Sequence, residues 1–214
     1  MKKLITESDI LELEKKGVKV LVKSKETILT PLAIDRIRSS KFTIVEKEHI
    51  SPEPNSKANG SQSNKIKNIV IGSDHTGFRL KNILIKFLID KGYSVFDSGT
   101  FDENSCDYPD IAKNVAVRIA SDEFDAGILI DATGIPSSIT ANKIKGIRAA
   151  TCYDTFSAKS SRAHNNSNVL VLGARAIGED SIKTIIETWL VTNFEGGRHQ
   201  RRLDKITDIE NENL

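Results

Sequence analysis

The sequence contains few cysteines and no long apolar run. Only two cysteines, Cys106 and Cys152, occur among 214 residues, and they lie 46 positions apart. This number and spacing match neither a disulfide framework nor a zinc-binding pattern, so a reducing compartment such as the cytoplasm is expected. No apolar stretch approaches the roughly 18 residues of a membrane-spanning helix. The first residues, MKKLITE, are too charged for a secretory signal, so neither a membrane span nor export is expected.

The chain also lacks a surplus of either charge. It has 31 lysines and arginines against 29 aspartates and glutamates, which leaves a formal net charge of +2. Such a balance argues against a nucleic-acid-binding surface and against an anionic-membrane-binding surface. Apolar residues make up 38% of the chain and charged residues 28%, which is typical of a globular protein with a buried core.

One segment lacks the residues that build a core. Residues 51–65, SPEPNSKANGSQSNK, contain four Ser, three Asn and two of the five Pro, and Ala58 is their only apolar residue. The segment therefore predicts a flexible linker. It separates a small N-terminal module, residues 1–50, from a larger domain, residues 66–214. No internal repeat is evident in either part.

The first fifty residues predict the element order α-β-α-β. Thr6 and Asp9 form a capping box before a short apolar helix. Alternating valines over 18–22 predict a strand, Pro31 favours the first turn of a second helix, and residues 42–45 predict a second strand. A module of this size buries little surface, so we expect it to be marginally stable by itself.

The larger part alternates strands with helices. Apolar runs predict strands at 69–71, 93–97, 126–130, 147–151 and 168–172, and amphipathic runs predict helices at 77–91, 109–120, 136–144, 155–163 and 179–191. Five such units predict an α/β fold with a five-stranded parallel sheet between helical layers, a three-layer α/β/α, Rossmann-like arrangement. In this class of fold the ligand lies beyond the carboxyl ends of the strands.

Polar residues suited to one chemistry follow several of these elements. Loop N–H groups and helix N-termini favour anions, histidines transfer protons near neutral pH, and arginines bind phosphate through paired hydrogen bonds. Together they predict a small phosphorylated ligand and proton-transfer chemistry. The residues are Asp74 and His75 after the first strand, Asp131, Thr133, Gly134 and Ser138 after the third, His164 and Asn165 at the end of the fourth helix, Arg175 after the fifth strand, and Arg198 and Arg202 near the C-terminus.

Each of these residues also has a purely structural interpretation. Asp74 can cap a helix, and His164 can lie against the negative end of a helix dipole. Thr133 and Gly134 can form an ordinary turn, and the C-terminal arginines can form a solvated cluster. The functional interpretation is favoured because the residues recur at several ends of one predicted sheet.

Five motifs, taken in order along the chain, resemble the ribose-5-phosphate isomerase B / galactose-6-phosphate isomerase family: GSDHTGFRLK, DYPDIA, TGIPSSITANKIKGIRAA, HNNSNVLVLGAR and FEGGRHQRR. The resemblance covers about residues 67–207. It implies a three-layer α/β/α protein that works as a homodimer or tetramer, with active sites shared between subunits. It also implies aldose–ketose isomerisation of a phosphorylated sugar, of the ribose 5-phosphate type, through an enediolate and without a metal or organic cofactor.

The resemblance assigns roles to the residues at the strand ends. His164 matches the acid or base that opens the sugar ring, and Thr133 matches a hydroxyl that assists proton movement between oxygens. Asp131 takes the position of the proton-transfer base. The residues that match substrate-binding positions are Asp74, His75, Asp107, Gly134, Ser138, Asn165, Arg175, Arg198 and Arg202.

The loop that begins at Asp131 departs from the family pattern. The usual loop reads Cys-Gly-Thr-Gly-x-Gly, with the cysteine as base, whereas this chain has Asp131, Ala132 and Pro136 at the first, second and last positions. Pro136 also removes an N–H donor from the loop. The Ile-Asp-Ala sequence resembles the A-type subunit of galactose-6-phosphate isomerase, which lacks the cysteine and works with a second subunit. This chain nevertheless keeps His75, which that subunit tends to lose.

Two functional hypotheses follow from this departure. In the first, the protein is an active isomerase in which the Asp131 carboxylate, in a dry site, replaces the thiolate as base. In the second, it is a non-catalytic or partner-dependent sugar-phosphate-binding subunit. A nucleotide-binding switch is disfavoured, because the chain has neither a Walker lysine loop nor a GxGxxG motif after its first predicted strand in the larger domain.

The N-terminal module resembles a segment found on some enzymes of ethanolamine-utilisation and related bacterial microcompartments, through ITESDILELEKKGVKVLV and ILTPLAIDRI. This resemblance implies that residues 1–50 contact a microcompartment shell or cargo partner. The alternative is an extension that aids assembly or solubility.

Overall fold

The computed structural model describes residues 3–15, 20–24, 27–40, 43–47 and 66–212. The chain divides into two compact units, Met1–Gly60 and Ser61–Leu214. The predicted linker at 51–65 lies outside the described residues. Among the residues that are described, none of the helices is long and apolar enough to cross a membrane.

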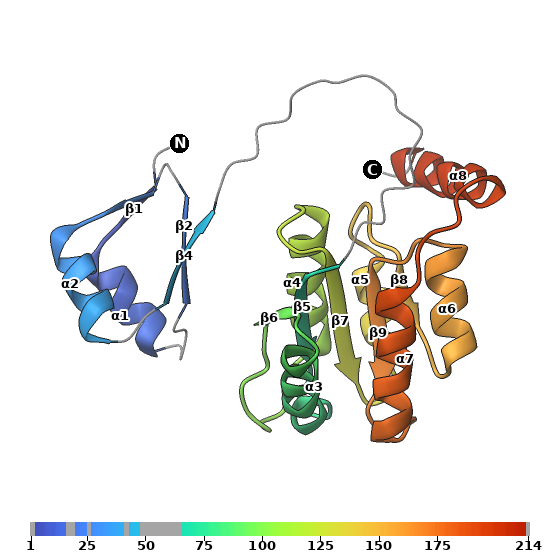
Figure 1. Cartoon of the computed structure of the whole chain (residues 1–214), viewed down its shortest axis with the longest axis horizontal. Helices are drawn as coiled ribbons and strands as arrows, with labels where there is room; N and C mark the ends of the chain where they lie inside the picture. The colour runs from blue at the N-terminus through green and yellow to red at the C-terminus, as the bar shows by residue number, and fades with distance from the viewer. Residues whose placement is uncertain (1–2, 16–19, 25–26, 41–42, 48–65, 213–214) are drawn as a thin grey trace. The chain divides into compact units, whose positions relative to one another are not determined.

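The small unit consists of two β-α-β halves (Figure 1). The first comprises β1 (Lys3–Ile5), α1 (Glu7–Lys15) and β2 (Val20–Ser24), and the second comprises β3 (Thr27–Leu29), α2 (Pro31–Ser39) and β4 (Thr43–Lys47). β1 pairs with β3 and β2 pairs with β4, both in parallel. The structure thus repeats one unit. The expected order α-β-α-β missed this repeat, because three-residue strands such as β1 and β3 leave almost no periodic pattern.

Both helices of the small unit begin as the sequence predicts. Asp9 accepts hydrogen bonds from the N–H and the hydroxyl of Thr6, each at 2.8 Å. Thr30 caps α2 by accepting a hydrogen bond from the Ala33 N–H at 3.3 Å, and Pro31 lies in the first turn. A core of few residues stabilises a fold only weakly. Among the described residues of this unit, the core consists of Ile5, Ile10, Ala33 and Ile37.

The large unit contains the predicted five-stranded parallel sheet, in the order β6-β5-β7-β9-β8. The strands are β5 (Asn68–Ser73), β6 (Ser94–Asp97), β7 (Ala126–Asp131), β8 (Ala149–Thr151) and β9 (Val169–Gly173). The helices are α3 (Phe78–Asp90), α4 (Tyr108–Ala120), α5 (Ile135–Ala141), α6 (Thr155–Ala163), α7 (Glu179–Val191) and α8 (Arg198–Glu212). The α/β fold class predicted from the sequence is therefore confirmed.

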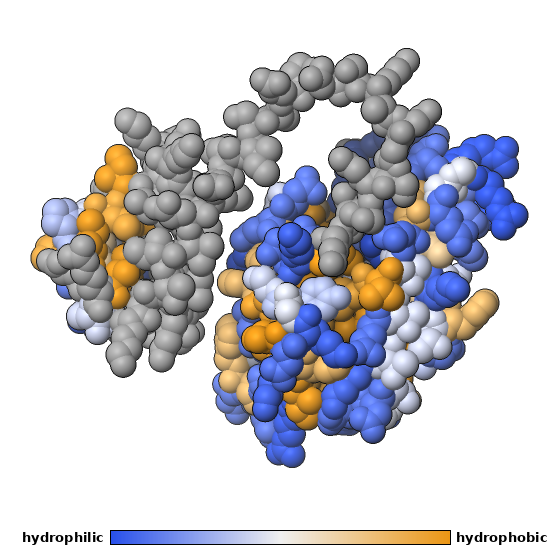
Figure 2. All heavy atoms as spheres, viewed as in Figure 1, coloured by the Kyte–Doolittle hydropathy of each residue, from blue (hydrophilic) through white to orange (hydrophobic). Residues whose placement is uncertain are grey.

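Neighbouring strand residues pack on opposite faces of the sheet. In β5, Ile69 and Ile71 belong to the core formed with α3, α6 and α7, whereas Val70 belongs to the core formed with α4 and α5. Because both faces are buried, the strands are apolar throughout and do not alternate with polar residues. The face of the large unit seen in Figure 2 carries blue hydrophilic residues with orange apolar residues between them.

Helix α8 was not predicted, because its sequence was interpreted as a charged tail. Gly196 and Gly197 have φ angles of +64° and +56°, a conformation that favours glycine, and they turn the chain into this helix. His199 and Leu203 then bury one side of the helix. The charged residues occupy the remaining surface, which explains why composition alone concealed the helix.

Lys81 is a buried lysine that links α3 to the segment after β6. Its side chain has no exposed surface, and it forms an ion pair with Asp97. It also donates a hydrogen bond to the Thr100 carbonyl at 2.8 Å and lies over the ring of Phe101. Burial lowers the pKa of Lys81, and the Asp97 carboxylate opposes this shift. The contacts fix the segment that leads towards Asp107.

We expect the substitution Lys81→Met to lower the free energy of unfolding by about 2–4 kcal/mol. This value lies near the lower end for a buried pair, because the Asp97 side chain is 29% exposed. Urea unfolding measures the change, with Lys86→Met on the exposed face of the same helix as the control. Equal stability of the two variants would show that the buried ion pair contributes nothing to the fold.

Candidate active site

Several of the predicted residues converge at the carboxyl edge of the sheet. In the parallel register Ser73 lies opposite Ile130, and Asp131 lies opposite Gly173. The chain segments after these strands then bond to one another. The Asp74 N–H donates to the Ile130 carbonyl at 3.0 Å, and the Arg175 N–H donates to the Ala132 carbonyl at 3.0 Å. The loops after β5, β7 and β9 are therefore neighbours, as the sequence predicts.

The carboxylate of Asp131 is buried and accepts three backbone hydrogen bonds. Its Oδ1 accepts from the Thr133 N–H at 2.8 Å and from the Gly134 N–H at 2.6 Å, and its Oδ2 accepts from the Ser137 N–H at 3.1 Å. The residue is 1% exposed. The side chain therefore organises the loop that leads into α5.

Asp74 has a similar environment at the end of β5. Its Oδ1 accepts hydrogen bonds from the Thr76 N–H at 2.8 Å and from the Gly77 N–H at 3.1 Å. The structural interpretation of Asp74 as a residue that orders the start of a helix is thus supported. His75 follows it, and its Nδ1 accepts a long hydrogen bond, 3.4 Å, from the Cys106 N–H. This contact brings the exposed Asp107 to the same edge.

The loop from Thr133 to Ser138 packs closely against β8. Gly134 has a φ of +83°, and a Cβ at this position would lie 2.8 Å from Thr151, so only glycine fits. Thr133 is exposed, and its Oγ1 accepts from the Ile135 N–H at 3.2 Å. The Ser138 hydroxyl donates to a β8 carbonyl at 3.4 Å rather than facing solvent freely.

The remaining predicted residues lie at the opposite edge of the sheet. α6 runs back from the carboxyl ends of the strands, so its C-cap residue His164 and the following Asn165 precede the start of β9. Arg198 and Arg202 lie at the beginning of α8, next to the end of α6 (Figure 1). Within one chain, the structure thus divides the predicted site between two edges.

Two residues that the sequence analysis did not single out complete the group around His164. The His164 and His199 rings stack with centroids 4.3 Å apart, and Glu195 Oε2 lies 3.7 Å from His164 Nε2. Burial lowers the pKa of His199, and the positive charges of nearby residues such as Arg198 lower it further. Both residues lie within the FEGGRHQRR motif, but their proximity to His164 depends on the turn at Gly196.

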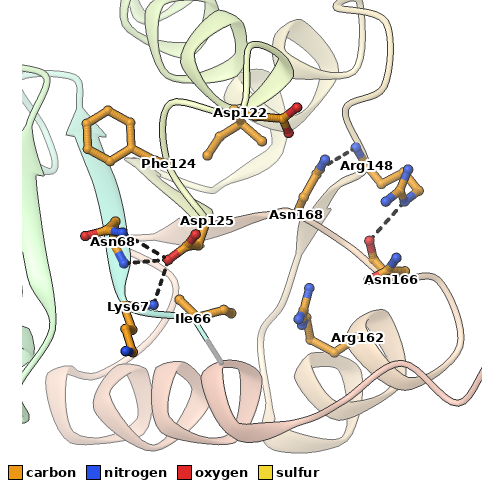
Figure 3. A pocket seen from close by; sticks show the side chains of 11 residues that line it. Ile66, Lys67, Asn68, Asp122, Phe124, Asp125, Arg148, Arg162, Asn166 and Asn168 are labelled. Carbon is orange, nitrogen blue, oxygen red and sulfur yellow. Dashed lines mark hydrogen bonds between the residues drawn. The ribbon is translucent and has the colours of Figure 1, made fainter. Parts of the chain in front are cut away.

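A pocket of about 770 Å³ lies at this amino edge, and none of the predicted site residues lines it (Figure 3). Two arginines line it instead. Arg148 Nε donates to the carbonyls of Asn165 and Asn166, at 3.1 and 2.9 Å, and Arg162 donates to the Ser167 carbonyl at 2.6 Å. The arginines thereby hold the turn that follows His164.

Comparisons with known proteins agree with this arrangement of strands and loops. The family described as Ribose/Galactose Isomerase matches residues 69–206. Ribose-5-phosphate isomerase B of Escherichia coli is 46% identical over 145 residues, which make up 68% of this chain and 97% of that protein.

Solved structures give the same result. Ribose-5-phosphate isomerase B of Clostridium thermocellum has a TM-score of 0.68 and 47% identity, covering 69% of this chain and 99% of that one. The Mycoplasma genitalium enzyme, solved with bound ribulose 5-phosphate, has a TM-score of 0.64 and 44% identity, covering 68% of this chain and 97% of that one. From Ile69 onwards, the chain belongs to the ribose/galactose isomerase family.

Proposed function

We propose that this protein interconverts the aldose and ketose forms of a phosphorylated sugar, of the ribose 5-phosphate and ribulose 5-phosphate type. The observation that carries the proposal is the convergence of the Asp74–His75 loop, the Asp131–Ser138 loop and Arg175 at one edge of a family-typical sheet. The relatives supply the substrate class, because they include ribose-5-phosphate isomerases B and one of these was solved with bound ribulose 5-phosphate.

The reaction needs three kinds of group. His164 opens the sugar ring by transferring a proton, and a base then moves a proton between C1 and C2. Backbone N–H groups of the 133–137 loop stabilise the enediolate oxygen, with the Thr133 hydroxyl assisting. Arg198 and Arg202 bind the phosphate through charge-assisted hydrogen bonds.

These groups meet only if two copies of the chain combine. β9 has five residues and separates the two edges by about 17 Å at roughly 3.3 Å per residue. A pentose phosphate cannot bridge that distance through the sheet. We therefore propose a homodimer or tetramer in which the carboxyl edge of one protomer faces the His164 and Arg198 region of another.

Asp131 stands at the position of the base, but its hydrogen bonds limit that role. The loop N–H groups that donate to an enediolate oxygen in this proposal already donate to the Asp131 carboxylate. Taking a proton from carbon weakens these hydrogen bonds, because a neutral carboxyl accepts them less strongly than a carboxylate does. We therefore propose slow turnover with Asp131 as base.

The same hydrogen bonds favour a second candidate function. A buried carboxylate that occupies the loop donors fits a subunit that binds a sugar phosphate without catalysing its isomerisation. Such a subunit depends on a partner with a cysteine at the position of Asp131. The two candidates differ in whether the purified protein turns over a sugar phosphate alone.

We expect Arg198→Ala to weaken binding of ribose 5-phosphate by about 1.5–3 kcal/mol, the range for a charged hydrogen bond. Isothermal titration calorimetry measures the change. Arg201→Ala, an exposed arginine in the same helix that the proposal leaves out of the site, is the matched control. An affinity that falls equally in both variants would indicate a general charge effect and not a phosphate site.

We expect Asp131→Asn to lower turnover of ribose 5-phosphate at least about 10²-fold, because it removes the general base. The asparagine keeps one acceptor oxygen, so the loop keeps part of its bonding. Asp131→Cys should be tolerated or faster. The control is Asp125→Asn, which alters an aspartate that accepts two backbone hydrogen bonds at the amino edge.

Equal turnover by the wild type and Asp131→Asn would show that Asp131 is not the base. If the protein turned over no sugar phosphate until a cysteine-bearing homologue was added, the partner-dependent subunit would be the correct function.

For the N-terminal module we propose a role outside catalysis, as a contact to a microcompartment shell or cargo. None of the candidate site residues precedes Asp74, so a chain that begins at Lys65 should keep its fold, ligand binding and turnover.

Residues 1–50 fused to a fluorescent protein should enter microcompartments in a host that makes them. Loss of ligand binding by the folded, shortened chain would contradict the modular organisation, and a diffuse reporter would contradict the targeting role.

A further inference from the structure

We propose that His164, Glu195 and His199 form a binding site for a divalent transition-metal ion such as Zn²⁺. The three side chains come from the end of α6, the α7–α8 connection and the first turn of α8. One potential ligand atom from each lies within 4.8 Å of the others. Two imidazoles and one carboxylate form a ligand set that zinc accepts in proteins.

The distances suit an ion better than direct hydrogen bonds. Glu195 Oε2 lies 3.7 Å from His164 Nε2 and 3.8 Å from His199 Nε2, beyond the 2.7–3.2 Å of a good hydrogen bond. A tetrahedral zinc ion with bonds of about 2.0–2.1 Å places its ligand atoms about 3.4 Å apart. Glu195 therefore needs to approach each ring by a few tenths of an ångström. The two rings stack at an interplanar angle of 6°, so one of them must also turn before both Nε2 lone pairs point at one ion.

The backbone holds the three segments together before an ion arrives, so that only side chains need to move. The Glu195 N–H donates to the Ala163 carbonyl at 3.0 Å, which fixes the α7–α8 connection against the end of α6. The His199 N–H donates to the Gly196 carbonyl at 3.0 Å and fixes the first turn of α8. Such preorganisation lowers the entropic cost of binding.

A neighbouring hydroxyl orients one of the ligands. The Ser160 Oγ lies 3.2 Å from His164 Nδ1, which leaves Nε2 as the nitrogen that faces Glu195. Outer contacts of this kind fix the ring orientation of metal-binding histidines. The side chains of His164 and Glu195 are 42% and 58% exposed, so an ion can reach the site from solvent.

Two arginines oppose binding of a cation. Arg198 Nε lies 3.4 Å from His199 Nε2, and the positive charge of Arg202 also acts on this ring. The Arg198 side chain must move aside for the ion to bind. Removing it should therefore strengthen metal binding, whereas the proposed function expects the same change to weaken sugar-phosphate binding. The opposite signs separate the two proposals.

Where the proposed function holds, the ion acts as an inhibitor and not as a cofactor. Coordination of His164 Nε2 occupies the lone pair that ring opening needs. The metal would then block proton transfer without any change of fold. Metal affinity is measured without turnover, so the test of the metal site does not depend on the isomerase activity.

The test is calorimetric titration of Zn²⁺ into the full chain in a buffer free of phosphate and chelators. We expect one ion per chain, and affinity reduced at least about 10-fold in Glu195→Gln and in His199→Asn. Glu187→Gln, an exposed glutamate in α7, is the matched control and should bind as the wild type does. Arg198→Ala should bind several-fold more tightly.

Co²⁺ absorption identifies the ligands. Nitrogen and oxygen ligation gives only weak visible bands, whereas a thiolate ligand gives an intense near-ultraviolet band that would point to Cys106 beside His75. Unchanged Zn²⁺ affinity in Glu195→Gln, or the thiolate band, would overturn the proposal and indicate an adventitious ion only. Glu195 is exposed, so we expect Glu195→Gln to fold. It therefore tests the metal site even if His199→Asn does not fold.

Discussion

The candidate active site at the carboxyl edge depends on the parallel pairing of β5, β7 and β9. Parallel pairing sends all three strand ends to one edge, and the register sets Asp131 beside Gly173. A Cβ on Gly173 would lie 2.6 Å from the Thr133 carbonyl oxygen, so the loop after β7 can approach β9 only because a glycine is there. The positions of the loops are thus fixed by strand geometry and by the absence of one side chain.

The same edge shows a conflict between stability and chemistry at Asp131. A carboxylate at the end of a buried strand costs free energy unless its oxygens are hydrogen-bonded. The chain meets this need with the Thr133, Gly134 and Ser137 N–H groups, and Pro136 offers none. A thiol at this position would need fewer donors and leave them to a substrate oxygen. An aspartate where the family pattern has a cysteine therefore changes the hydrogen bonding of the loop and, in the proposed function, the base as well.

The sequence predicted the sheet well because long apolar runs can only be buried on both faces. It predicted less where the signal depends on tertiary contacts. Lys81 would be assigned to the surface by its type, yet its stem and charge are buried against Phe101 and Asp97. Glu195 and His199 come together with His164 only through the turn at Gly196, a property of backbone angles that composition does not express.

The predicted residues are divided between two edges of the sheet, and the proposed homodimer or tetramer is what would bring them together. A helix that follows a parallel strand returns to the amino edge, so the end of α6 cannot lie beside the loop that begins at Asp131 in the same protomer. In the proposed function, Arg148 and Arg162 hold the turn after His164 for chemistry that a second protomer completes. On that proposal protomer association, and not the fold of one chain, determines whether His164 and Asp131 act on one sugar.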